Sequence, residues 1–179
     1  MKATGIVRRV DDLGRIVIPK EIRRTLKIRE GDPLEIYTEK DGGVIFRKYS
    51  PMEDLQEFAG HICEAIHATT GRAAAVTDRD SIIATAGVPK RELLDKPNSP
   101  ELERLMESRK AYRFQAGDAI IRCAEGIDKF PVSVAAPVIS QGDLLGCVLL
   151  LSEEPQPMSE NDHQLVQTIA SFLGKQMES

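Results

Sequence analysis

The sequence lacks any apolar stretch long enough to cross a membrane. Its longest apolar run, residues 144–151, has eight residues, whereas a transmembrane helix needs about 20. The beginning of the chain also lacks the charged start and apolar segment of a secretory signal peptide. We therefore expect a cytoplasmic protein that does not bind a membrane.

Cysteine is scarce as well. The chain has three cysteines, Cys63, Cys123 and Cys147, without C-x-x-C spacing, which argues against a disulfide framework and fits a reducing compartment. Cys123 and Cys147 are expected to be small core residues. Cys63 and His67 lie four residues apart with His61 nearby, but tetrahedral zinc needs more ligands than one such helix face offers. We expect no metal site.

Catalytic motifs are also absent. The sequence has no G-x-S-x-G, no phosphate-binding Gly-rich loop and no H-E-x-x-H. The carboxylates of its second part have no spacing that suggests acid–base chemistry. We expect no enzyme and no cofactor, with a small-molecule-dependent enzyme in the second part of the chain as a rival hypothesis.

What the sequence does have is an uneven charge distribution. Residues 1–50 hold 12 Lys+Arg and 8 Asp+Glu, a balance of +4, whereas residues 51–179 hold 12 and 20, a balance of −8. A basic first domain on an acidic second one is expected when only the first meets nucleic-acid phosphate.

Residues 11–28 carry the strongest local signal. Asp11, Leu13 and Gly14 supply turn chemistry, residues 16–18 form a β-branched run, and Pro19 suits a first helical position. On the predicted helix, Ile22 and Leu26 point one way. The other face carries a basic stripe: Lys20, Arg23, Arg24 and Lys27. Like charges at this spacing oppose helix formation, so the stripe favours a polyanion partner over a merely solvated face.

Two further strands are expected at residues 33–39 and 44–49, joined by the turn 40–43, and one at residues 4–10. A domain of about 50 residues buries too little surface to be stable alone. We therefore expect residues 1–50 to form an obligate dimer.

Four motifs resemble the AbrB family of swapped-hairpin DNA-binding regulators: Thr4–Val10 (TGIVRRV), Leu13–Pro19 (LGRIVIP), Ile22–Leu26 (IRRTL) and Gly31–Asp32. The resemblance implies a β-barrel of interleaved hairpins whose shared core is formed by Ile6, Val10, Ile16, Ile18, Leu34, Ile36, Val44 and Phe46. It also implies binding of double-stranded DNA by Arg8, Arg15, Arg23 and Arg24, to which Lys2, Arg9, Lys20 and Lys27 would add phosphate contacts. One departure is Lys27, which stands where such domains often carry glycine.

After a short linker at residues 51–52, residues 53–179 show an α+β order. Helices are expected at 53–69, 100–108 and after a capping box at 159–162, and strands at 73–77, 81–86, 133–139 and 144–152, the last of them central. This order resembles a GAF domain, most clearly at residues 136–148. The whole chain thus resembles AbrB-type transcription factors of spore-forming bacteria.

The GAF resemblance implies two roles for the second domain. Its first and last helices would pair between subunits, which predicts a homotetramer made of two swapped dimers. Its middle segment would cover an unknown small-molecule ligand, which we expect to touch Phe114, Ile120, Ile121 and Phe130. The main alternative function is an antitoxin-type autorepressor, but antitoxins usually carry a short disordered tail rather than a folded second domain.

Overall fold

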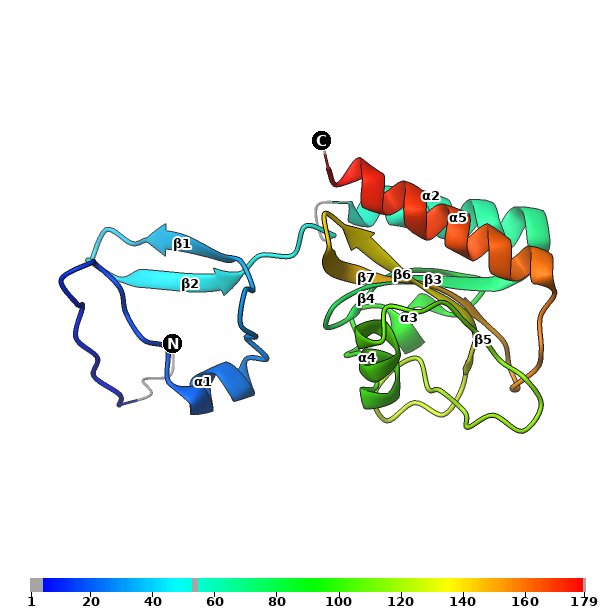
Figure 1. Ribbon diagram of the computed structural model, residues 1–179, viewed down its shortest axis with the longest axis horizontal. Coiled ribbons are helices and arrows are strands. Elements are labelled where there is room, and N and C mark those ends of the chain that lie inside the picture. The colour runs from blue at the N-terminus through cyan, green and yellow to red at the C-terminus, as the bar shows by residue number, and fades with distance from the viewer. Residues whose placement is uncertain (1–4, 53–54, 179) are drawn as a thin grey trace. The chain divides into compact units, whose positions relative to one another are not determined.

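The computed structural model describes residues 5–52 and 55–178. The chain divides into two units, Met1–Tyr49 and Ser50–Ser179, each with its own β-sheet (Figure 1). Among the described residues, none of the helices combines the length and the apolar character needed to span a bilayer.

The first unit contains the predicted β-hairpin. Strands β1 (Leu34–Thr38) and β2 (Val44–Lys48) are antiparallel, with Ile36 opposite Phe46. The turn is closed by the Glu39 N–H, which donates to the Gly43 carbonyl at 2.8 Å. Gly42 has a φ of 90°, a conformation that glycine adopts without a steric penalty.

The short helix α1 (Lys20–Thr25) precedes the hairpin. It begins one residue later than predicted, so Pro19 is its N-cap. At its other end the Ile28 N–H donates to the Arg23 carbonyl at 2.8 Å, and the Lys27 N–H donates to the Arg24 carbonyl at 3.3 Å. These two bonds are a Schellman motif, whose left-handed residue is ordinarily glycine. Here it is Lys27, with a φ of 50°.

The structure corrects the predicted strands at residues 4–10 and 16–18. In the described part, from Gly5, neither segment is a strand. An extended segment becomes a strand only when another strand pairs with it, and the sheet of this unit contains β1 and β2 alone.

The second unit is built on a five-stranded antiparallel sheet in the order β4-β3-β7-β6-β5. Its strands are β3 (Ala73–Asp78), β4 (Ile82–Ala86), β5 (Tyr112–Arg113), β6 (Val132–Ser140) and β7 (Asp143–Leu151). The predicted central strand is confirmed, because β7 lies between β3 and β6 and is buried at seven of its nine positions.

Helices cover both faces of this sheet. Helices α2 (Gln56–Thr70) and α5 (Glu160–Gln176) lie on one face, and α3 (Lys90–Leu93) and α4 (Pro100–Glu107) lie on the other (Figure 1). Alternate residues of β7 serve the two layers: Val148 and Leu150 pack in the cluster under α2 and α5, and Leu149 and Leu151 pack in the other. The sheet is therefore the middle layer of an α/β/α sandwich.

Helix α5 begins and packs as its sequence requires. Ser159 and Asp162 form the predicted capping box, in which each side chain accepts a hydrogen bond from the other residue's backbone N–H. Near the other end, a Cβ at Gly174 would overlap the carbonyl oxygen of Ile139. Glycine at this position thus allows α5 to approach β6 closely.

Two features of the second unit differ from the prediction. Met52, assigned to the linker, is fully buried in the cluster under α2 and α5. The one-turn helix α3 and the two-residue strand β5 were not predicted, because elements this short show no hydrophobic period.

The Schellman motif of α1 generates a stability prediction. Lys27→Gly should stabilise the first unit by about 1 kcal/mol, because a left-handed conformation costs roughly that much for a residue with a Cβ. Thermal unfolding followed by circular dichroism measures the change. Lys40→Gly is the matched control, since Lys40 is not among the residues with positive φ. Equal effects of the two substitutions would contradict this explanation.

Candidate nucleic-acid interface

The basic side chains predicted to contact DNA lie on three parts of the first unit. Arg8 and Arg9 precede the turn at residues 11–15, Arg15 ends that turn, α1 carries three more, and Lys27 follows α1. All seven that the structure describes are exposed: Arg8, Arg9, Arg15, Lys20, Arg23, Arg24 and Lys27. Lys2 lies outside the described residues. The four other arginines and Lys20 form no ion pair with a residue that the structure describes, so their charges are available to an anion.

The turn that presents Arg15 is organised by the Asp11 carboxylate. Its Oδ1 accepts hydrogen bonds from the backbone N–H groups of Leu13 at 3.0 Å and Arg15 at 2.8 Å. Its Oδ2 accepts one from the Arg15 Nε at 2.7 Å. The backbone closes around it, since the Asp11 N–H donates to the Arg15 carbonyl at 3.0 Å. Gly14 supplies the left-handed residue, with a φ of 76°.

This arrangement orients the Arg15 side chain and leaves its terminal guanidinium nitrogens able to donate hydrogen bonds. The Nε is held by Asp11, whereas the side chain as a whole remains 70% exposed. The two terminal nitrogens of the guanidinium can therefore still donate to a phosphate or to a guanine edge. Sequence analysis assigned Asp11 only to a turn; its spacing of four residues from Arg15 was the signal that could have identified the pair.

The hydrogen bonds from the Arg15 backbone, the Arg15 side chain and Leu13 lower the pKa of Asp11 below its ordinary value. A carboxylate with a lowered folded-state pKa contributes stability above its unfolded pKa and loses that contribution as the pH falls through the folded value. The turn is therefore fully formed at neutral pH, where DNA binding would take place.

Helix α1 presents its charges on an exposed surface. None of its residues is buried, and Leu26, which was expected to share an apolar face with Ile22, is exposed in the single chain. Arg23 and Arg24 occupy the last turn, where positive charge interacts favourably with the helix dipole. Both are displayed to solvent rather than folded onto the unit.

The residues expected to contact a small molecule do not share one environment. Phe114 is buried, Ile121 and Phe130 are half-buried and pack against the cluster on the α3 and α4 face, and Ile120 is exposed. Their assignment as ligand contacts stays a prediction.

The cysteine and histidine side chains of α2 do not converge. Cys63 is fully buried in the core, where desolvation raises its pKa to about 12. His67 is exposed, and its Nδ1 lies 2.9 Å from the Arg72 carbonyl oxygen. Within the described ranges, no three potential metal ligands lie together. Cys123 and Cys147 are both fully buried in the core, as expected.

Two family models match adjoining parts of the chain. The model described as "Stage V sporulation protein T C-terminal, transcription factor" matches residues 54–178. The model described as "Antidote-toxin recognition MazE, bacterial antitoxin" matches residues 7–54.

Similar proteins agree with this division. The chain is 46% identical over 179 residues to stage V sporulation protein T of Bacillus subtilis (strain 168), with 99% of each chain covered. Its first part is 63% identical over 51 residues to the transition state regulatory protein AbrB of the same strain, which covers 28% of this chain and 52% of that one.

A solved structure confirms the fold of the second unit. The GAF domain of the Acinetobacter phosphoenolpyruvate-protein phosphotransferase matches with a TM-score of 0.55 and 10% identity, over 69% of this chain and 81% of that chain. With an AbrB-type first unit and a GAF-type second unit, the chain belongs to the stage V sporulation protein T family of transcription factors.

Proposed function

We propose that the protein is a DNA-binding transcription regulator of sporulation genes that acts in the cytoplasm and contacts double-stranded DNA with its first unit. The observation that carries this proposal is the display of exposed arginines on the first unit, four of which have no ion-pair partner among the described residues. The acidic balance of the second unit makes it a poor surface for phosphate. The same reading predicts no enzymatic activity.

The first unit acts as a dimer. Of the eight residues expected to form a shared core, six are exposed in the single chain and Ile18 and Leu34 are half-buried. Ile36 is 64% exposed and Val44 56% exposed. Exposed apolar side chains on this scale mark an interface. A second copy with interleaved hairpins covers them.

Two-fold symmetry doubles the arginines that face DNA. Arginine donates a planar fork of N–H groups to phosphates and to guanine edges. Because these arginines come from a turn and an extended segment as well as from a helix, DNA shape and bendability contribute to recognition alongside base edges.

Replacing Arg24 or Arg15 with alanine should reduce the salt dependence of DNA binding. Each neutralised phosphate contributes about −0.9 to the slope of log affinity against log salt, so a dimer that loses two contacts becomes shallower by about 1.8. Fluorescence anisotropy at several salt concentrations measures the slope. Lys110→Ala is the control, since Lys110 is exposed on the acidic second unit. Arg113, a second basic residue of that unit, is a poorer control because it forms an ion pair with Glu160 at 2.7 Å. Unchanged slopes in both arginine variants would remove these residues from the interface.

The Asp11→Ala variant tests whether Asp11 affects DNA binding through its negative charge or through the orientation that it gives to Arg15. Removing a carboxylate makes the first unit more basic, so charge alone predicts tighter DNA binding. We expect binding about tenfold weaker, because Arg15 loses the hydrogen bond that orients it. Asp12→Ala removes the same charge from the adjacent exposed residue and should bind as well as the parent or better. Tighter binding by both variants would show that Asp11 does not position Arg15.

We infer that the second unit drives assembly from dimer to tetramer. Helices α2 and α5 leave apolar side chains exposed on their outer side. Phe58 of α2 and Phe172 of α5 are 37% and 46% exposed, and their ring centroids lie 6.1 Å apart. A second pair of helices that packs on this aromatic pair closes a dimer of dimers, a symmetric arrangement that satisfies both interfaces.

The double variant Phe58→Lys, Phe172→Lys should therefore halve the number of subunits per assembly, because burying lysine without a partner is costly. Analytical ultracentrifugation gives the mass. Ile120→Lys serves as the control, since Ile120 is also exposed but lies on neither helix. If the double variant, or a chain truncated after Pro51, has as many subunits per assembly as the parent protein, the assembly proposal is wrong.

One observation favours a second function: the antitoxin family model matches residues 7–54. A regulator with this barrel could act as an autorepressor paired with a toxin. The second unit argues against that role, because it is a folded sandwich over the range where an antitoxin usually carries a disordered tail.

A further inference from the structure

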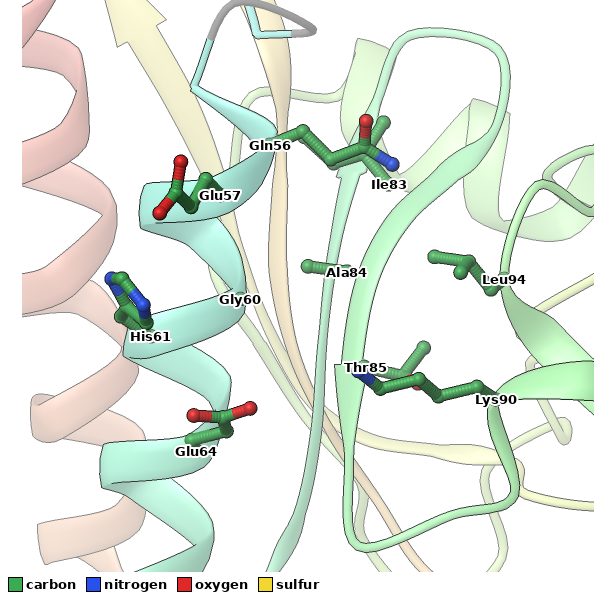
Figure 2. A pocket seen from close by; sticks show the side chains of 10 residues that line it. All are labelled: Gln56, Glu57, Gly60, His61, Glu64, Ile83, Ala84, Thr85, Lys90 and Leu94. Atoms are coloured by element: carbon green, nitrogen blue, oxygen red, sulfur yellow. The ribbon is translucent and has the colours of Figure 1, made fainter.

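A pocket of about 250 Å³ lies between α2 and β4 in the second unit (Figure 2). Thr85, which lines it from β4, pairs with Ala75 and so directs its side chain to the opposite face of the sheet, under α3 and α4. The other polar side chains of the lining are exposed to solvent. These groups do not form one ligand site. The first unit, in contrast, holds a covered carboxylate that is paired with a distant lysine.

Asp32 carries that carboxylate, and it closes the loop between α1 and β1. Its side chain is only 4% exposed. Its Oδ2 accepts a hydrogen bond from the Arg29 N–H at 2.8 Å, and the Asp32 N–H donates to the Arg29 carbonyl at 3.2 Å. Gly31 allows this tight turn, with a φ of 82°. Burying a carboxylate is costly unless it is paired and hydrogen-bonded, and Lys48 supplies the opposite charge.

Lys48 reaches the loop because of the register of the hairpin. Strand β2 runs antiparallel to β1, so its last residue, Lys48, lies opposite Leu34, the first residue of β1. The Lys48 Nζ lies 3.7 Å from the Asp32 Oδ2 and donates a hydrogen bond to the Lys27 carbonyl oxygen at 3.0 Å. Lys48 therefore joins the end of β2 both to the loop and to the residue that follows the C-cap of α1.

The Lys27 backbone is connected to two of the arginines that are expected to contact DNA. In the Schellman motif, the Lys27 N–H donates to the Arg24 carbonyl and the Ile28 N–H donates to the Arg23 carbonyl. A group that holds Lys27 therefore also holds the last turn of α1. The helix has no buried residue, so packing within a single chain constrains its position little.

We propose that Lys48 and Asp32 are positioning residues for DNA recognition. They hold the C-terminal end of α1 at the hairpin, and thereby fix where Arg23 and Arg24 present their guanidinium groups. This role rests on the proposed binding of DNA by the first unit.

The role is confined to α1 and does not extend to the preceding turn. Arg15 lies in that turn, which is closed locally by the Asp11 carboxylate. Lys48 itself makes no phosphate contact, because its ammonium is engaged by the Lys27 carbonyl oxygen and by Asp32.

The Asp32→Asn variant distinguishes positioning from a direct contact between Lys48 and DNA. The substitution removes a negative charge and releases the Lys48 ammonium, so a direct phosphate contact predicts tighter DNA binding. Positioning predicts binding about tenfold weaker, because the carboxylate that holds Lys48 is lost. Glu30→Gln is the matched control: it removes the same charge from an exposed residue of the same loop, and should bind as tightly as the parent protein or more tightly.

Double-mutant cycles in the full-length protein give a readout that a general loss of structure would not produce. Lys48→Met should weaken DNA binding about tenfold. In the Lys48→Met background, Arg24→Ala should cost little further affinity, whereas Arg15→Ala should cost as much as it does in the parent protein. Lys40→Met removes the same charge from an exposed position of the hairpin turn, and should leave both arginine effects unchanged.

Fluorescence anisotropy with a labelled random-sequence DNA duplex at low salt measures each affinity, because phosphate contacts give sequence-independent binding. If Lys48→Met and Asp32→Asn bind like the parent while Arg24→Ala weakens binding, positioning is overturned and DNA recognition by the first unit stands. If neither Arg24→Ala nor Arg15→Ala changes the affinity of the parent, both proposals are overturned.

Two further outcomes overturn positioning alone. Tighter binding by Asp32→Asn, or full effects of both arginine substitutions in the Lys48→Met background, would show that Lys48 does not act through α1. Loss of both arginine effects in that background would assign Lys48 to the fold of the whole first unit.

Discussion

A single copy of the first unit cannot bury its own apolar side chains, and most features of that unit follow from this constraint. Its hairpin has apolar residues on its exposed surface, and the segment before α1, in the part that the structure describes, belongs to no sheet. Local hydrogen bonds, rather than packing in a core, therefore fix the conformation of the turn and of the helix end. The Asp11 carboxylate holds one turn, and a Schellman motif ends α1. Both devices leave the arginines directed to solvent.

The second unit, in contrast, buries its apolar side chains within a single chain. Its sheet is covered on both faces, so its central strand can be apolar on both sides and still be buried. Glycines at close approaches and a complete capping box allow α5 to pack tightly on the sheet. This unit leaves an aromatic pair, Phe58 and Phe172, exposed on its two long helices. The basic charge balance, in contrast, belongs to the first unit.

The two units differ both in net charge and in whether a single copy forms its own core. The unit that carries the arginines leaves most of its apolar side chains exposed in a single copy. The unit with its own core carries the acidic balance. Such a division suits a transcription factor of the stage V sporulation protein T family, in which an AbrB-type unit is followed by a GAF-type unit.

The sequence by itself determined the features that depend on neighbouring residues. Turn chemistry located the hairpin at Gly42, the Ser159 and Asp162 spacing located the start of α5, and the unbroken apolar run located the central strand. Family motifs predicted which arginines contact DNA. Only the tertiary structure decided that Met52 belongs to a core and that Asp11 holds Arg15. In the described part of a single chain, the segment before α1 pairs with no strand. These features depend on which distant segments of the chain contact each other. The hydrophobic periodicity of a single sequence carries no information about such contacts.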